Sequence, residues 1–167
     1  ILDSARMSHF ICEKLGYGAG QIESSVMGGH GDAMVPLVNY STVAGVSLPE
    51  LLSKEDIEDI VTKTKNGGLQ IVKLLETGSA YYAPAHATSL MVEAILHNTR
   101  KIYPCSVMLD GEYDCKNVVS GVPVMLGSNG IEKIIELNLN EEQKELFANS
   151  VAPVQELIDT LDEKFFI

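Results

Sequence analysis

Residues 102–126 read IYPCSVMLDGEYDCKNVVSGVPVML and give the clearest indication of the fold. Two runs rich in β-favouring residues, 102–109 and 117–126, lie on either side of a turn that begins with Asp110-Gly111. Asp-Gly is a dipeptide that favours a tight connection between neighbouring strands. We therefore expect these two runs to pair as antiparallel strands.

The rest of the chain predicts a further strand and several helices around this pair. Ser128-Asn129-Gly130 is a second hairpin signal, and it predicts a return strand over residues 131–139. Apolar residues at spacings of three and four predict amphipathic helices, because such residues share one helical face. These helices are expected over residues 4–15, 54–75, 85–99 and 141–165. Because helices and strands come in blocks, the fold class is predicted to be α+β with antiparallel pairing.

The composition excludes several classes of protein. The chain has 167 residues, a length typical of one domain, and 23 acidic against 12 basic residues give a net charge of −11. Such a chain has no basic face for a phosphate backbone, so we expect no nucleic-acid partner. It also has no apolar run long enough to span a bilayer and no export leader, so we expect no membrane partner and a cytoplasmic location.

The cysteines and the first residue add two expectations. Cys12, Cys105 and Cys115 are odd in number and have no CxxC spacing, which favours free thiols in a reducing compartment over disulfides or a zinc site. The chain opens with Ile1 and has no initiating Met, so we expect it to be part of a longer protein.

Asp3 and Arg6 allow two interpretations. They are three residues apart, so both side chains can project from one side of the first turn of a helix. An exposed pair of this kind is common and contributes little to stability. The alternative is a functional pair, but the spacing alone favours the surface ion pair.

His30 is the best candidate for acid–base chemistry. It lies in the glycine-rich run Gly28-Gly29-His30-Gly31-Asp32, which leaves the ring open to close approach by a ligand. Imidazole titrates near neutral pH, as a general acid or base must. The alternative is a solvent-exposed loop histidine. Because His30 and Asp32 alone supply too few ligands, no metal site is expected.

Two other glycine-containing stretches need an explanation. Gly67-Gly68 lies inside the predicted 54–75 helix, where each glycine costs about 1 kcal/mol relative to alanine. A kink in the helix, or another group that passes close to the helix backbone, would explain the glycine pair. The stretch GSAYYAPA at 78–85 precedes a predicted helix start, which could bind an anion or simply be a helix-entry turn. The sequence contains no GxGxxG dinucleotide fingerprint.

Six short stretches are spread along the whole chain. They read LDSAR at 2–6, GGHGDAMVP at 28–36, TKNGG at 64–68, GSAYYAPA at 78–85, GVP at 121–123 and LGSNG at 126–130. Each stretch is a weak signal alone, but in this order the combination is specific and resembles the malate/lactate dehydrogenase family. The Gly-Gly-His form is most similar to the malate dehydrogenases that are lactate dehydrogenase-like in sequence.

This resemblance covers only the family's C-terminal half. It implies that residues 1–167 form the substrate-binding and catalytic domain, with antiparallel strands packed against long helices. The N-terminal Rossmann half, which carries the glycine fingerprint for NAD, would be absent.

The resemblance also implies a role for each candidate residue. His30 would accept the hydroxyl proton when malate is oxidised to oxaloacetate with NAD as cofactor. Asp3 would orient the imidazole, and Arg6 would bind the carboxylate of this small dicarboxylate substrate through two parallel hydrogen bonds. Tyr81 and Pro84 would line the nicotinamide side. The family's members are oligomers, so a homo-oligomer, either a dimer or a tetramer, is implied.

Two alternatives remain open at this stage. A lactate dehydrogenase would use the same three residues, and the loop that discriminates between the substrates is not in this sequence. The chain by itself could also be a non-catalytic domain that self-associates through exposed apolar surface. On either interpretation, we expect no NADH oxidation by residues 1–167 alone.

Overall fold

The sheet predicted from residues 102–126 is at the centre of the fold. The computed structural model describes residues 1–161. Strands β6 (Lys101–Asp110) and β7 (Lys116–Gly127) pair antiparallel, with Cys105 opposite Val122. The prediction of this hairpin is confirmed, and Gly111, at a φ of 126°, begins the connection.

The return strand is shorter than predicted. Strand β8 (Gly130–Ile134) pairs with β7, and the Ile135 N–H still donates to the Pro123 carbonyl of β7 at 2.8 Å, but residues 136–139 lie outside the sheet. The Tyr113 hydroxyl donates to the Ile135 carbonyl at 2.7 Å and accepts from the Leu137 N–H at 3.0 Å. Backbone groups that would extend the strand are therefore taken up by a side chain from the β6–β7 connection.

Short strands complete the five-stranded sheet and form a second, smaller one. Strands β2 (Val26–Gly28) and β3 (Met34–Pro36) extend the large sheet in the order β3-β2-β7-β6. The only paired residues between β2 and β7 are Gly28 and Gly121. The small sheet consists of β1 (Ile22–Glu23), β4 (Thr42–Val43) and β5 (Val46–Ser47).

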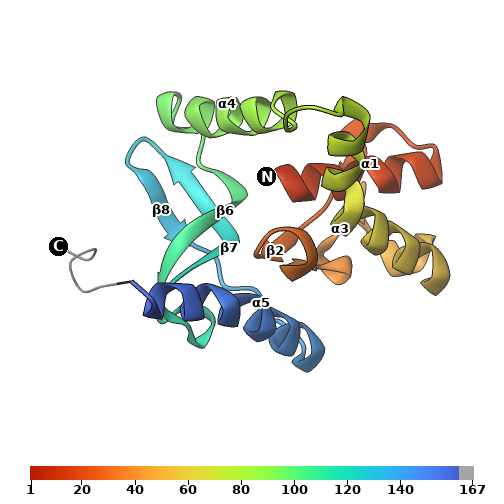
Figure 1. The fold of residues 1–167 in the computed structure, drawn as a ribbon. Helices are drawn as coiled ribbons and strands as arrows, with labels where there is room; N and C mark the ends of the chain where they lie inside the picture. The colour runs from red at the N-terminus through yellow and green to blue at the C-terminus, as the bar shows by residue number, and fades with distance from the viewer. Residues whose placement is uncertain (162–167) are drawn as a thin grey trace.

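Long helices cover the large sheet and form a second layer beside it. Helices α4 (Tyr82–Leu96) and α5 (Glu141–Asp159) lie on opposite sides of the β6–β8 strands (Figure 1). Helices α1 (Leu2–Leu15) and α3 (Lys54–Leu75) pack against each other, and the short α2 (Leu48–Leu51) precedes α3. The α+β class with antiparallel strands packed against long helices is confirmed.

Several helix boundaries differ from the prediction: α1 begins at Leu2 rather than at residue 4, and α4 ends at Leu96 rather than at residue 99. Helix α4 begins at Tyr82 rather than after Pro84, so Pro84 lies in its first turn. Proline is tolerated there because the first turn does not use its missing N–H. Helix α5 ends at Asp159, and the last part of the predicted 141–165 helix lies outside the described residues.

Strand β2 lies between two hydrophobic cores. One core joins the large sheet to α5 and includes Met27, Val122 and Phe147. The other joins α1, α3 and the small sheet and includes Val26 and Met7. Because successive side chains of a strand point to opposite faces, Val26 and Met27 enter different cores. The glycine-rich loop that contains His30 begins where this strand ends.

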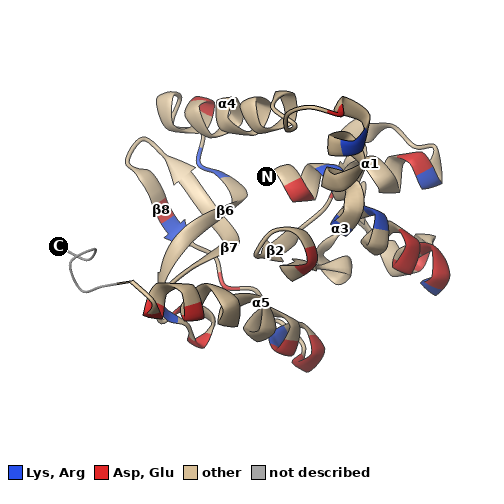
Figure 2. Ribbon diagram, in the orientation of Figure 1, with Lys and Arg blue, Asp and Glu red and all other residues tan. Residues whose placement is uncertain are grey.

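The surface is unevenly charged. Acidic side chains gather at the start of α3 and of α5, while α4 is nearly uncharged (Figure 2). Within residues 1–161, every helix falls short of the length and apolar content that a membrane span needs.

Candidate functional site

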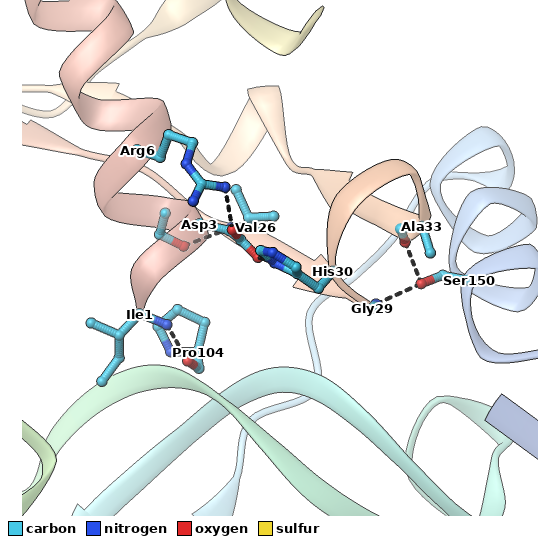
Figure 3. Close-up of polar contacts among 10 residues, drawn as sticks. Ile1, Asp3, Arg6, Val26, Gly29, His30, Ala33, Pro104 and Ser150 are labelled. Carbon is cyan, nitrogen blue, oxygen red and sulfur yellow. Dashed lines mark hydrogen bonds and ion pairs between the residues drawn. The ribbon is translucent and has the colours of Figure 1, made fainter. Parts of the chain in front are cut away.

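Asp3 bridges Arg6 and His30. The Arg6 Nη1 group donates to Asp3 Oδ1 at 2.9 Å, and His30 Nδ1 lies 2.9 Å from Asp3 Oδ2 (Figure 3). The side chains of Arg6 and Asp3 are only 12% and 19% exposed, whereas that of His30 is 67% exposed. The interpretation of Asp3 and Arg6 as a surface ion pair is therefore wrong, because the pair is mostly buried and holds a third group.

The first turn of α1 is fixed against β2. Ser4 Oγ accepts a hydrogen bond from the Val26 N–H at 3.0 Å, and Ser24 Oγ donates to the Ser4 carbonyl at 2.5 Å. Ser4 is 8% exposed, so these bonds are shielded from water. Asp3 therefore projects from a helix end whose position relative to β2 is defined.

The His30 loop, which we define as Gly29 to Ala33, leaves β2 through a tightly packed glycine. Gly28 has a φ of 79°, a conformation that favours glycine. A Cβ on its neighbour Gly121 would lie 2.6 Å from the Gly28 carbonyl oxygen, so β2 and β7 can approach this closely only because Gly121 lacks a side chain. This close contact sets the point from which the loop begins.

Gly67 allows the Arg6 side chain to cross α3. A Cβ at Gly67 would lie 2.5 Å from Arg6 Cδ, while one at Gly68 would lie 3.5 Å from Nη2, an ordinary contact distance. Helix α3 runs unbroken through both residues. Of the two explanations offered for the glycine pair, the close approach to the backbone is therefore correct.

Arg6, His30 and Pro84 line one cavity of about 470 Å³. Helix α3 contributes Lys65, whose Nζ lies 3.5 Å from the Asp32 carbonyl, and the stretch before α4 contributes Ser79 and Ala80. Sequence reasoning missed Lys65 as a lining residue, although Lys65 lies in the TKNGG stretch at 64–68 that contributes to the family resemblance. The other lining residues are Leu2, Gly31, Asp32, Gly68, Leu69 and Val72.

Tyr81 lies apart from this cavity. Its side chain is 62% exposed and packs on Tyr82, with ring centroids 4.6 Å apart. Pro84 lines the same cavity as His30, but Tyr81 does not, and the role of Tyr81 stays a prediction.

A second hollow of about 460 Å³ lies on the other side of His30 and Asp3. It is lined by Cys105 and Met91 among others, and burial raises the pKa of the Cys105 thiol. That thiol therefore stays protonated at neutral pH and is a poor nucleophile. Since the first cavity contains the guanidinium of Arg6, it is the better place for an anion.

The geometry assigns the protons at this site. An ionised carboxylate only accepts hydrogen bonds, so His30 Nδ1 must carry the proton that it shares with Asp3. In the neutral ring, Nε2 is then free to accept a proton. Among residues 1–161, no group of three or more metal-ligating side chains converges here or elsewhere. The site thus combines a base, a carboxylate that orients it and a cation for an anionic substrate.

Comparison with known proteins identifies the family. Residues 1–165 match the model of the lactate/malate dehydrogenase α/β C-terminal domain. Malate dehydrogenase of Sulfurimonas denitrificans is 65% identical over 167 residues, which is 99% of this chain and 52% of that protein. The chain therefore spans about half the length of the curated relatives it matches.

Solved structures agree with this assignment. Malate dehydrogenase from Aeropyrum pernix has a TM-score of 0.92 at 43% identity, covering 98% of this chain and 54% of its own. Lactate dehydrogenase from Eimeria maxima with NADH and oxamate has a TM-score of 0.91 at 41% identity, covering 95% and 49%. With Asp3, Arg6 and His30 brought together as the family resemblance implied, the chain belongs to the lactate/malate dehydrogenase family, of which it represents the C-terminal domain.

Proposed function

We propose that residues 1–167 are the substrate-binding and catalytic domain of an NAD-dependent malate dehydrogenase, with a Rossmann half elsewhere in the same protein. The observation that carries this proposal is the bridge from Arg6 through Asp3 to His30, beside one cavity. Relatives named malate dehydrogenase at 58–65% identity favour malate over lactate.

Arg6 binds and orients the substrate. Within residues 1–161, only its Nη1 donates to a protein acceptor, which leaves donors for a bidentate bond to a carboxylate. Lys65 adds a second positive charge to the cavity lining. A strongly acidic chain can bind a dicarboxylate in this way because its cations are held at the site.

His30 then moves the proton. Its Nε2 accepts the proton of the substrate hydroxyl as malate is oxidised, and returns it when oxaloacetate is reduced. Asp3 holds the tautomer that leaves Nε2 free, and it stabilises the imidazolium that forms. NAD supplies the acceptor for the hydride that leaves the substrate carbon.

This chain fits only the reactive end of NAD. The small residues Ser79 and Ala80, together with Pro84, line the cavity beside His30 and leave room for a flat ring. The sequence has no glycine fingerprint for the pyrophosphate. The remainder of the cofactor site therefore belongs to the proposed Rossmann half.

The setting of the enzyme is part of the same proposal. We place the full-length protein in the cytoplasm, as a tricarboxylic acid cycle enzyme and a dimer or tetramer. Free cysteines support a reducing compartment, and the exposed Leu74, Tyr82 and Leu96 support burial of α3 and α4 against other protein surface. Light scattering of the full-length protein measures the number of subunits.

The decisive experiment compares substrates and removes the base. Full-length protein is assayed with NADH and either oxaloacetate or pyruvate, and we expect oxaloacetate to be preferred. His30→Asn should abolish turnover while the affinity for NADH stays nearly unchanged. A preference for pyruvate would instead support lactate dehydrogenase, and near-normal turnover of His30→Asn would refute the role of His30.

A further inference from the structure

One hydroxyl from the last helix holds both ends of the His30 loop. Ser150 Oγ accepts a hydrogen bond from the Gly29 N–H at 2.7 Å and donates one to the Ala33 carbonyl at 2.5 Å (Figure 3). Gly29 and Ala33 are the first and last residues of the loop. No other side chain of α5 hydrogen bonds to this loop within residues 1–161.

Ser150, like Ser4 of α1, bonds through its hydroxyl to residues outside its own helix, whereas Thr64 and Thr88 do not. Thr64 and Thr88 donate to carbonyls four residues earlier in their own helices. That is the common behaviour of a serine or threonine inside a helix. Ser150 instead bonds to residues more than a hundred positions away in the sequence, and it is 3% exposed. The Ser150 side of both bonds is thus buried, and hydrogen bonds are stronger away from water.

The packing around Ser150 leaves the loop little freedom. A Cβ at Gly28 would clash with Ser150 Oγ, and a Cβ at Gly29 would lie 3.1 Å from the Ala33 Cβ. On the other side, Gly121 of β7 touches the Gly28 carbonyl. The start of the loop is therefore confined between β7 and α5.

The imidazole itself has little else to fix it. The His30 side chain is 67% exposed, and its one hydrogen bond within residues 1–161 is to Asp3. Asp3 sets the orientation of the ring, but the position of the ring also depends on where the loop backbone lies. Proton transfer needs the base within about 3 Å of its partner, and a displacement of about 1 Å can lower a rate a hundredfold.

We propose that Ser150 is a positioning residue, which clamps the His30 loop at both ends and so sets the place of the imidazole for proton transfer. This inference rests on the proposed function for its kinetic consequence. It assigns Ser150 no contact with the substrate, since Ser150 is absent from the lining of both cavities beside His30. Loss of the clamp should therefore slow the chemical step without weakening substrate binding.

The test uses three variants of the full-length protein. Ser150→Ala removes both hydrogen bonds, and Ser150→Cys keeps the volume with a weak donor and acceptor. Val151→Ala is the matched control. Val151 is the next residue of α5 and is buried in the core, but its apolar side chain forms no hydrogen bond with the loop. Thermal unfolding shows whether the variants lose similar stability.

We expect both Ser150 variants to lower kcat for malate oxidation by about tenfold and to leave the substrate KM within about twofold. The isotope effect on kcat with malate deuterated at the reacting carbon should rise, because the chemical step becomes slower than product release. Val151→Ala should change neither quantity. A Ser150→Ala enzyme with the kcat and isotope effect of Val151→Ala would overturn the proposal.

A second measurement does not depend on the substrate. Amide hydrogen exchange over residues 29–33 should become faster in Ser150→Ala than in Val151→Ala of equal stability. If the wild-type protein does not oxidise malate, the proposed function fails, and this comparison alone decides the role of Ser150. Equal exchange in the two variants would then refute it.

Discussion

At the scale of single residues, the site depends on one carboxylate that serves two partners. Asp3 accepts from Arg6 through one oxygen and from His30 through the other, both at 2.9 Å. On the proposed function, substrate binding by Arg6 and proton transfer by His30 are therefore coupled through Asp3, and a change at Asp3 is expected to disturb both. A lysine could not replace Arg6, because its single ammonium cannot bond to Asp3 and form a parallel pair with a substrate carboxylate.

Gly67 offers a sharp test at this scale. Gly67→Ala should raise the KM for oxaloacetate about tenfold, because the new methyl group would displace the Arg6 side chain. Gly68→Ala is the control for narrowing of the cavity, because Gly68 also lines it but its methyl group would meet Arg6 at an ordinary contact distance. Both changes replace glycine by alanine within one helix, so the gain in helix propensity is the same. The measurement is the KM of each full-length variant, and equal values for the two would contradict this role of Gly67.

At the scale of elements, three separate segments meet around the site. Helix α1 supplies Asp3 and Arg6, the loop after β2 supplies His30, and α3 passes behind Arg6. The bonds from the Val26 N–H to Ser4 Oγ and from Ser24 Oγ to the Ser4 carbonyl hold α1 against β2 and the residue two positions before it. The distance between Asp3 and His30 is therefore set by the contact between two elements as well as by the side chains.

We expect Ser4→Ala to lower the free energy of unfolding by about 1–3 kcal/mol, because the buried Val26 N–H loses its acceptor. The measurement is urea unfolding of the full-length protein. Ser8→Ala is the control, since Ser24 keeps its bond to the Ser4 carbonyl when the Ser8 hydroxyl is removed. A loss of stability no larger for Ser4→Ala than for Ser8→Ala would show that the Ser4 hydroxyl does not hold the two elements together.

At the scale of the whole molecule, the proposed function assigns the acid–base and substrate groups to this chain and the glycine fingerprint for the nucleotide to another part of the protein. Residues 1–167 alone should therefore show no saturable NADH oxidation with oxaloacetate. Circular dichroism confirms in parallel that the helices and strands are formed, so that inactivity is not mistaken for unfolding. Saturable turnover by the folded fragment would disprove the proposal that the rest of the NAD site lies in another part of the protein.

The sequence by itself determined the local elements and the chemistry of the candidate residues. The hairpin at Asp110-Gly111 and the amphipathic helices follow from turn chemistry and from apolar periodicity, which act over a few residues. The glycine pair at 67–68 also indicated, through its cost in a helix, either a kink or a close approach to the backbone, and the structure shows that Arg6 approaches Gly67.

Only the tertiary structure decided which residues meet. The spacing of Asp3 and Arg6 favoured a weak surface pair, and burial against β2 and α3 changed that conclusion. The Tyr113 hydroxyl bonds to the backbone of Ile135 and Leu137, just beyond the end of strand β8. Ser150 bonds to the His30 loop from a helix that is distant in the sequence. The physical reason is that such contacts depend on how separate elements pack, and no periodicity or spacing within one element records them.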